Sequence, residues 1–199
     1  MKASTITAII AFTASAIASP VYKVAPVLRT RDAAVAAARC ANAANPGICQ
    51  SVVETINGWD ESVNTVNDFL NRAPLLAGQD LVNLENIALQ LALNEPGFLG
   101  ILKSTPGISP QGLAAATTLG QVFPAVPQNL QGLVQGTVTL TDAINNINTI
   151  RCPSILPNIS LLWVEAARAA GADTPGFALG PNFCPLLPAN VGDGYSLDV

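Results

Sequence analysis

The stretch QSVVETINGWDESVNTVNDFLNRA, residues 50–73, decides the fold class. Its apolar residues recur at alternating intervals of four and three, which places one apolar stripe along one side of an α-helix. They are Val52, Ile56, Trp59, Val63, Val66 and Leu70. Residues 126–151 repeat this spacing with Val126, Leu130, Leu133, Thr137, Leu140, Ile144 and Ile147. Because two striped helices cannot bury their apolar sides alone, the sequence predicts an all-α protein, a four- to five-helix up-down bundle.

Capping and breaking residues bound the remaining helices. Asp80 can cap a helix that Glu95-Pro96-Gly97 kinks or ends, with a further helical turn or two after it, and Ser109-Pro110 can open the next one. Cys152-Pro153 should end the long helix, and Gly171 should close the last one. The sequence therefore predicts helices over residues 50–73, 81–94, 110–123, 126–151 and 157–170.

The composition favours an aliphatic core and a surface that is polar but poor in charge. Half of the residues are hydrophobic, but only 5% are aromatic and 11% are charged, against roughly 25% charged in an average soluble protein. The net charge of −4 argues against a nucleic-acid partner, which would need a basic face. The sequence has no histidine, which excludes Ser-His-Asp and Cys-His catalysis and histidine-ligated zinc.

The N-terminus is typical of a secretory signal peptide. Lys2 precedes an apolar run, and Ala16-Ile17-Ala18 forms a small-x-small cleavage site. We therefore expect a signal peptide over residues 1–18, a propeptide or flexible arm over 19–39, a disulfide-bridged helical bundle over 40–184 and a C-terminal tail over 185–199. The expected location is secreted, either extracellular or in a cell wall, with no transmembrane segment.

Four cysteines in a secreted chain imply two disulfides that tether irregular N- and C-terminal arms to the bundle. Cys49 starts the first long helix, and Cys152 is expected to end the fourth helix at the same end of the bundle. This placement favours Cys49–Cys152 with Cys40–Cys184. The local pairing, Cys40–Cys49 with Cys152–Cys184, is the alternative.

No constellation of residues indicates catalysis or metal binding. The densest acidic group, Asp60-Glu61, consists of adjacent residues whose side chains diverge on a helix. The cysteines lack the C-x-x-C spacing of a zinc site. We therefore expect no enzymatic activity, no cofactor and no metal. Asn158-Ile159-Ser160 is a sequon that predicts a glycoprotein with its glycan at Asn158.

The helix expected over residues 81–94 carries more apolar residues than one buried face needs. Asn83, Asn86, Gln90 and Asn94 share a narrow polar arc, while Leu81, Leu84, Ile87, Ala88 and Leu91 form a broad apolar face. A second apolar stripe, separated from that face by Glu85, consists of Val82, Leu89 and Leu93. Either the helix is buried on two sides, or this second stripe adsorbs to an apolar surface.

Two segments resemble a known family. The run WDESVNTVNDFLN, residues 59–71, and the run ALNEP, residues 92–96, followed by a long Leu/Ile/Asn helix, resemble fungal secreted proteins of the hydrophobic-surface-binding type, also described as cell-wall mannoproteins. The likeness covers roughly residues 50–152. It implies a small non-catalytic helical bundle that coats hydrophobic solids or resides in the wall, and that recruits lipolytic enzymes there.

The favoured function is binding of hydrophobic surfaces or cell-wall material through Val82, Leu89 and Leu93, with a secreted enzyme as a further partner. One alternative is a secreted effector that binds a host protein. The other is a carrier of a small apolar ligand, which needs an internal cavity. Gly132 and Gly136, four residues apart in the expected long helix, either permit close helix packing or create such a cavity.

Overall fold

The computed structural model describes residues 39–173 together with Pro175, Ala178, Gly180 and Cys184. The expected signal peptide, the rest of the N-terminal arm and the C-terminal tail lie outside these described residues. All regular elements in the described part are helices, so the all-α prediction is confirmed. The elements are α2 (Pro46–Arg72), η1 (Ala73–Leu75), α3 (Gly78–Lys103), α4 (Pro110–Val122), α5 (Ala125–Val134), α6 (Leu140–Ile150), η2 (Arg151–Ile155) and α7 (Leu156–Ala170).

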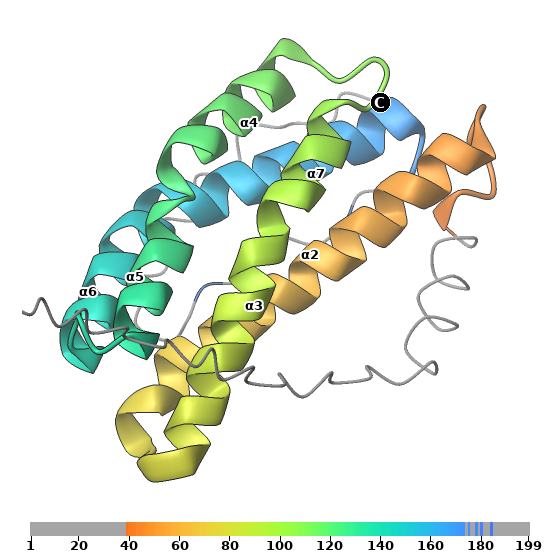
Figure 1. The fold of residues 1–199 in the computed structure, drawn as a ribbon. Helices are drawn as coiled ribbons and strands as arrows, with labels where there is room; N and C mark the ends of the chain where they lie inside the picture. The colour runs from red at the N-terminus through yellow and green to blue at the C-terminus, as the bar shows by residue number, and fades with distance from the viewer. Residues whose placement is uncertain (1–38, 174, 176–177, 179, 181–183, 185–199) are drawn as a thin grey trace, which may run out of the picture.

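The helices form an up-down bundle with four arms (Figure 1). The first two arms, α2 and α3, are an antiparallel pair joined by the short η1 turn. The third arm is α4 followed by α5, and the fourth is α6, η2 and α7 in succession. The third and fourth arms pack antiparallel, α4 on α7 and α5 on α6. The predicted bundle class is confirmed.

The stripe of α2 supplies the centre of the core. Asn45 caps the helix by accepting a hydrogen bond from the Ile48 N–H, and Pro46 occupies the first turn. The six predicted stripe residues of this helix are all buried. Trp59 stacks on Phe98 of α3 and meets Trp163 of α7 edge to face, which joins three arms at the middle of the bundle.

The prediction of one long helix over residues 126–151 is wrong. The chain leaves α5 at Val134, turns through Gly136 at φ +69°, and starts α6 after Thr139. A Cβ at Gly132 would lie 2.7 Å from Val138 Cγ2, so this glycine lets the turn fold back onto α5. Thr137, expected in the core, is exposed. Leu133, Leu140 and Ile144 are half-buried against the core.

Two prolines that were expected to interrupt helices lie inside helical segments. Pro96 sits within α3, which continues to Lys103. The fourth arm does not stop at Cys152-Pro153, because the π-helical turn η2 connects α6 directly to α7. Such wide turns accommodate an extra residue without breaking the path of a helix. The last helix ends as predicted, with Gly171 in the left-handed conformation at φ 72°.

The favoured disulfide pairing is wrong, and the local alternative is the observed one. Cys40 is bonded to Cys49, and Cys152 to Cys184. The physical reason is the continuity of the fourth arm. Because η2 carries the helix onward into α7, Cys152 lies within that arm and not at its end. The prediction of two disulfides is itself confirmed, and no cysteine is free.

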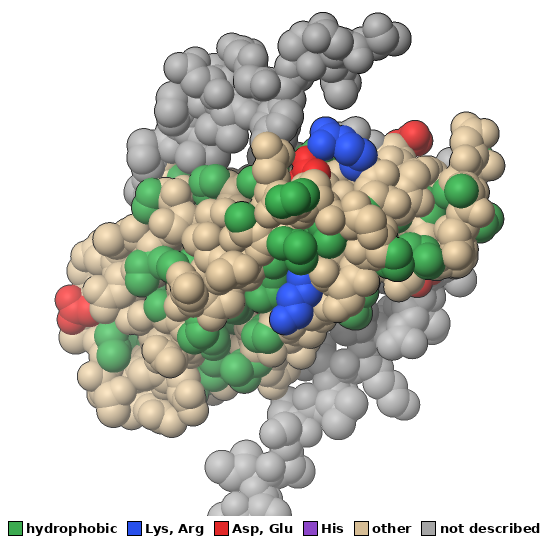
Figure 2. All heavy atoms as spheres, turned by 90° about the horizontal axis from the view of Figure 1, so that it is seen from above, with side chains coloured by type: hydrophobic (Ala, Val, Ile, Leu, Met, Phe, Trp, Pro, Cys, Tyr) green, Lys and Arg blue, Asp and Glu red, His purple; other side chains and the backbone are tan. Residues whose placement is uncertain are grey.

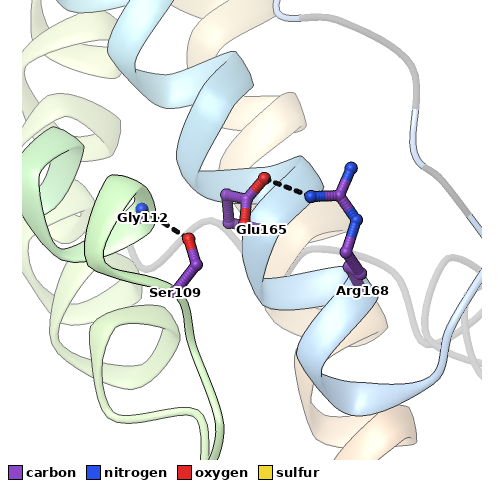
Figure 3. Close-up of polar contacts among 4 residues, drawn as sticks. All are labelled: Ser109, Gly112, Glu165 and Arg168. Carbon is purple, nitrogen blue, oxygen red and sulfur yellow. Dashed lines mark hydrogen bonds and ion pairs between the residues drawn. The ribbon is translucent and has the colours of Figure 1, made fainter. Parts of the chain in front are cut away.

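The contact between α4 and α7 depends on a glycine (Figure 3). Ser109 caps α4 by accepting a hydrogen bond from the Gly112 N–H at 3.1 Å. A Cβ at Gly112 would lie 2.9 Å from Glu165 Cβ and 2.8 Å from Ile108 Cγ1. Glu165, buried at this contact, accepts a 2.6 Å charge-assisted bond from Arg168 on the same helix. The first turn of α4 can therefore approach α7 only because residue 112 has no side chain.

Candidate functional site

The predicted surface-binding residues lie on the outer side of α3. Val82 is 44% exposed and Leu93 is 58% exposed. Leu89 lies between them in the sequence and on the same side of the helix, but it is half-buried and packs against the core. Ile87 and Ile101 are also exposed on α3. Two of the three predicted residues, Val82 and Leu93, are therefore exposed to solvent, whereas Leu89 packs partly against the core. We call Val82, Leu89 and Leu93 the α3 stripe.

The outer surface of α3 has no exposed charge between Asp80 and Lys103. Glu85, expected to separate two apolar stripes as a surface charge, is only 8% exposed, and burial raises the pKa of its carboxyl. Amide side chains and apolar side chains cover the rest of this surface. Figure 2 shows the same character on one face of the molecule, where hydrophobic side chains are interspersed with backbone and uncharged polar side chains, and charged side chains are sparse. Such a surface is weakly hydrated and suits apolar contact.

Opposite the α3 stripe, the inner side of α3 takes part in a buried polar cluster, formed by Trp59, Asn67, Glu95 and Arg151. All four side chains are buried. Trp59 Nε1 on α2 donates a 2.6 Å hydrogen bond to Glu95 Oε2 on α3. Arg151 Nη2, in η2, donates to the Val63 carbonyl at 3.0 Å and to Asn67 Oδ1 at 3.1 Å. The cluster therefore connects α3, α2 and the π-turn of the fourth arm.

Burial dominates the electrostatics of this cluster. It raises the pKa of Glu95 from 4.5 to about 7, against the opposing effects of the Arg151 charge and the Trp59 hydrogen bond. Burial also lowers the pKa of Arg151, while the Glu95 charge acts in the opposite direction. The carboxyl thus changes its charge near neutral pH, although it lies inside the protein. A perturbed carboxyl with a defined charge partner is a recognised mark of a functional or switching group.

Hydrogen bonding within the cluster is incomplete. Glu95 Oε1 and Arg151 Nη1 are both buried and have no hydrogen-bond partner among the described residues. The two groups act on each other electrostatically, but no direct ion pair joins them in this part of the structure. A buried polar atom without a partner costs free energy, so the cluster is a point of strain in the core. Since both side chains are fully buried, neither can meet a substrate in this state.

The buried polar cluster was not predicted, although the sequence contains a signal for it. Arg151 follows Ile147 by four residues and so continues the apolar stripe of the fourth arm. Glu95 follows Leu91 by four residues and lies on the broad apolar face of α3. A charge at a core position is rare unless it is paired. The spacing therefore marks both charged residues as core positions that need buried polar partners.

Three other expectations concern glycosylation, metal binding and membrane crossing. Asn158 is half-buried in the first turns of α7, and its Nδ2 donates a 2.7 Å hydrogen bond to the Ser154 carbonyl, so its glycosylation stays a prediction. Among the described residues, no group of three His, Cys, Asp or Glu side chains could hold a metal ion. Within the same residues, no helix has the length and apolar character needed to cross a membrane.

No protein-family model, no curated protein and no solved structure matches this chain.

Proposed function

We propose that this is a secreted, non-catalytic protein that binds hydrophobic surfaces or cell-wall material through the apolar side chains of α3. The observation that carries the proposal is the exposure of Val82 and Leu93 on a helix surface without exposed charge. The likeness of residues 59–71 and 92–96 to fungal hydrophobic-surface-binding proteins supports the same function. Recruitment of a secreted enzyme is part of that proposal.

Apolar contact should provide the free energy of adsorption. Full burial of a valine or leucine side chain contributes roughly 1.5–3 kcal/mol, and the half-exposed side chains of α3 contribute a part of that. One molecule therefore binds weakly, but a layer of many molecules on a solid gains from avidity. Since the contact surface has no charge, salt should not weaken it.

The test is retention on wax particles or polystyrene beads at high salt. The variant Val82→Ser/Leu93→Ser removes the exposed part of the α3 stripe and leaves the packing residue Leu89 in place. The matched control is Leu113→Ser/Val134→Ser, which removes one exposed leucine and one exposed valine from α4 and α5. We expect the wild type and the control to be retained and the α3 variant to be washed off.

Two outcomes would contradict the proposal. Equal retention of the α3 variant and the control would reject α3 as the contact surface. Loss of the wild type at high salt would reject apolar surface binding altogether. Circular dichroism of each variant before the assay excludes unfolding as the cause of lost retention.

A further inference from the structure

The part of α3 before Pro96 is held to the bundle by few large side chains. Its buried residues are two alanines and two glutamates: Glu85, Ala88, Ala92 and Glu95. The leucines of this segment, residues 78–95, are half-buried at best. Segments with few buried apolar contacts open at low free-energy cost. Segment 78–95 is therefore the part of the α2–α3 pair most able to separate from the core.

A weak point in the helix follows directly after this segment. Pro96 has no N–H, so the hydrogen bond that would reach the Ala92 carbonyl cannot form. Beyond Pro96, Leu99 and Leu102 are buried and anchor the C-terminal part of α3. The helix can therefore bend at Pro96 while its last turns stay in place. Glu95 lies next to this point and is bonded to α2 through Trp59.

We propose that the buried polar cluster is a pH-sensitive latch, in which protonated Glu95 holds segment 78–95 on α2 and ionised Glu95 lets this segment open about Pro96. Opening exposes the inner leucines of α3, Leu81, Leu84 and Leu91, which adds their apolar surface to that of the α3 stripe on the outer side. The latch thereby controls how much apolar surface is available for adsorption, and in this respect it rests on the proposed surface binding.

The direction of the effect follows from proton linkage. The closed state binds the Glu95 proton with a pKa of about 7, whereas an open state that hydrates the carboxyl returns the pKa toward 4.5. Opening is therefore rarest below the lower value. The equilibrium constant for opening increases by up to about tenfold per pH unit between pH 4.5 and about pH 7, and it levels off at higher pH. The closed state is favoured in acid, and the open state gains toward neutral and alkaline pH.

Other charged groups near α3 do not reverse this direction. Of the elements packed on α3, η1, α4 and α5 have no titratable side chain. On α7, Glu165 is paired with Arg168. Arg151 of η2 is the charged group that acts on Glu95. Glu85 on the segment itself and Asp60 on α2 also have pKa values raised by burial, so they add to the same trend. The remaining titratable groups of α2 are exposed or half-buried: Glu54, Glu61, Asp68 and Arg72.

Hydrogen–deuterium exchange in solution tests the latch without any adsorbing surface. After correction for the intrinsic exchange rate, the amides of residues 78–95 should open on the order of 100-fold more often near pH 8 than near pH 4.5. Glu95→Gln keeps an acceptor for Trp59 but cannot ionise, so most of this dependence should disappear. Glu61→Gln, at an exposed position of α2, is the control and should behave as wild type. An unchanged pH dependence in Glu95→Gln would overturn the latch.

A second measurement follows Trp59 directly. The chain has two tryptophans, so Trp163→Phe leaves Trp59 as the single emitter. Its fluorescence should titrate near pH 7 and lose that transition when Glu95→Gln is added. A transition that persists without the Glu95 carboxyl would also overturn the proposal.

Retention on wax as a function of pH separates the latch from the surface-binding function. If exchange is pH-dependent and retention of the wild type rises with pH but that of Glu95→Gln does not, the regulatory proposal is supported. If exchange is pH-dependent and retention is constant, the control of adsorption is rejected. If nothing is retained at any pH, the surface-binding proposal fails, whereas the exchange result still decides the latch.

Discussion

Arg151 joins three parts of the molecule through one side chain. Its backbone belongs to the π-turn η2, its guanidinium binds the Val63 carbonyl and Asn67 of α2, and its charge acts on Glu95 of α3. A buried guanidinium is costly unless its donors are used and its charge is compensated. Arg151 therefore stabilises the buried cluster and takes no part in the chemistry of the surface.

Replacing Arg151 should cost more at alkaline than at acidic pH. In Arg151→Met the Glu95 carboxyl loses its compensating charge, so its pKa rises further and its ionisation in the core becomes more costly. Near pH 8 we expect a loss of about 3–5 kcal/mol in the free energy of unfolding. Near pH 5 the neutral carboxyl needs no counter-charge, and the loss should be smaller. Urea unfolding at both pH values measures the difference.

The double variant Arg151→Met/Glu95→Gln is the control, because it removes both charges together. It should regain part of the stability near pH 8. An equal loss of unfolding free energy for Arg151→Met at both pH values would show that the pKa of Glu95 does not depend on the Arg151 charge.

At this scale, the sequence could place Arg151 and Glu95 in core positions but could not pair them. Both fit the apolar spacing of their helices, yet spacing gives only the face of a helix and not the neighbour that it meets. The pairing depends on the path between the two residues, which passes through the unforeseen turn between α5 and α6. Helical spacing separates the α3 stripe from the inner face, but it left open whether the stripe is buried against a neighbour or exposed.

Helix ends were predictable where a capping residue fixes them. Ser109 and Gly171 begin and end helices at the predicted places, whereas Asp80 lies in the first turn of α3 and Ala77 occupies the cap position. The long helix failed because its apolar spacing of four and three happens to continue across a turn. Thr139 and Asp142 mark the start of α6, since the Thr139 hydroxyl accepts a hydrogen bond from the Asp142 N–H. A capping residue inside an apolar pattern is therefore a stronger signal of a helix start than the continuing pattern is of one long helix.

The close approach of α4 to α7 gives a prediction with a control on the same helix. Gly112→Ala places a Cβ against Glu165 and Ile108, so α4 must shift, and we expect a loss of about 1–3 kcal/mol in the free energy of unfolding. A Cβ at Gly120 meets nothing within 4 Å. Gly120→Ala should therefore stabilise the protein by about 0.5–1 kcal/mol, because alanine is the better helix former. Thermal or urea unfolding of both variants checks the opposite signs, and destabilisation of equal size in both would contradict the packing argument.

For the molecule as a whole, the two disulfides should contribute unequally. Cys152–Cys184 closes a sequence separation of 32 residues and Cys40–Cys49 one of 9. The loss of chain entropy in the unfolded state predicts a contribution of about 4 kcal/mol for the longer loop and about 3 kcal/mol for the shorter one. The alanine pairs Cys152→Ala/Cys184→Ala and Cys40→Ala/Cys49→Ala measure this by urea unfolding. A larger loss for the shorter loop would show that strain or packing, and not loop length, decides.

The same pairing determines what a single proteolytic cut would do. Neither disulfide spans the loop over residues 104–109 between α3 and α4. One cut in that loop would therefore leave two fragments without a covalent link, each with its own disulfide. The first would keep the α2–α3 pair, and the second would keep the two arms from α4 to α7. Only noncovalent contacts in the shared core would then hold the two fragments together. A nicked sample mixed with an isotope-labelled nicked sample should therefore exchange fragments with it.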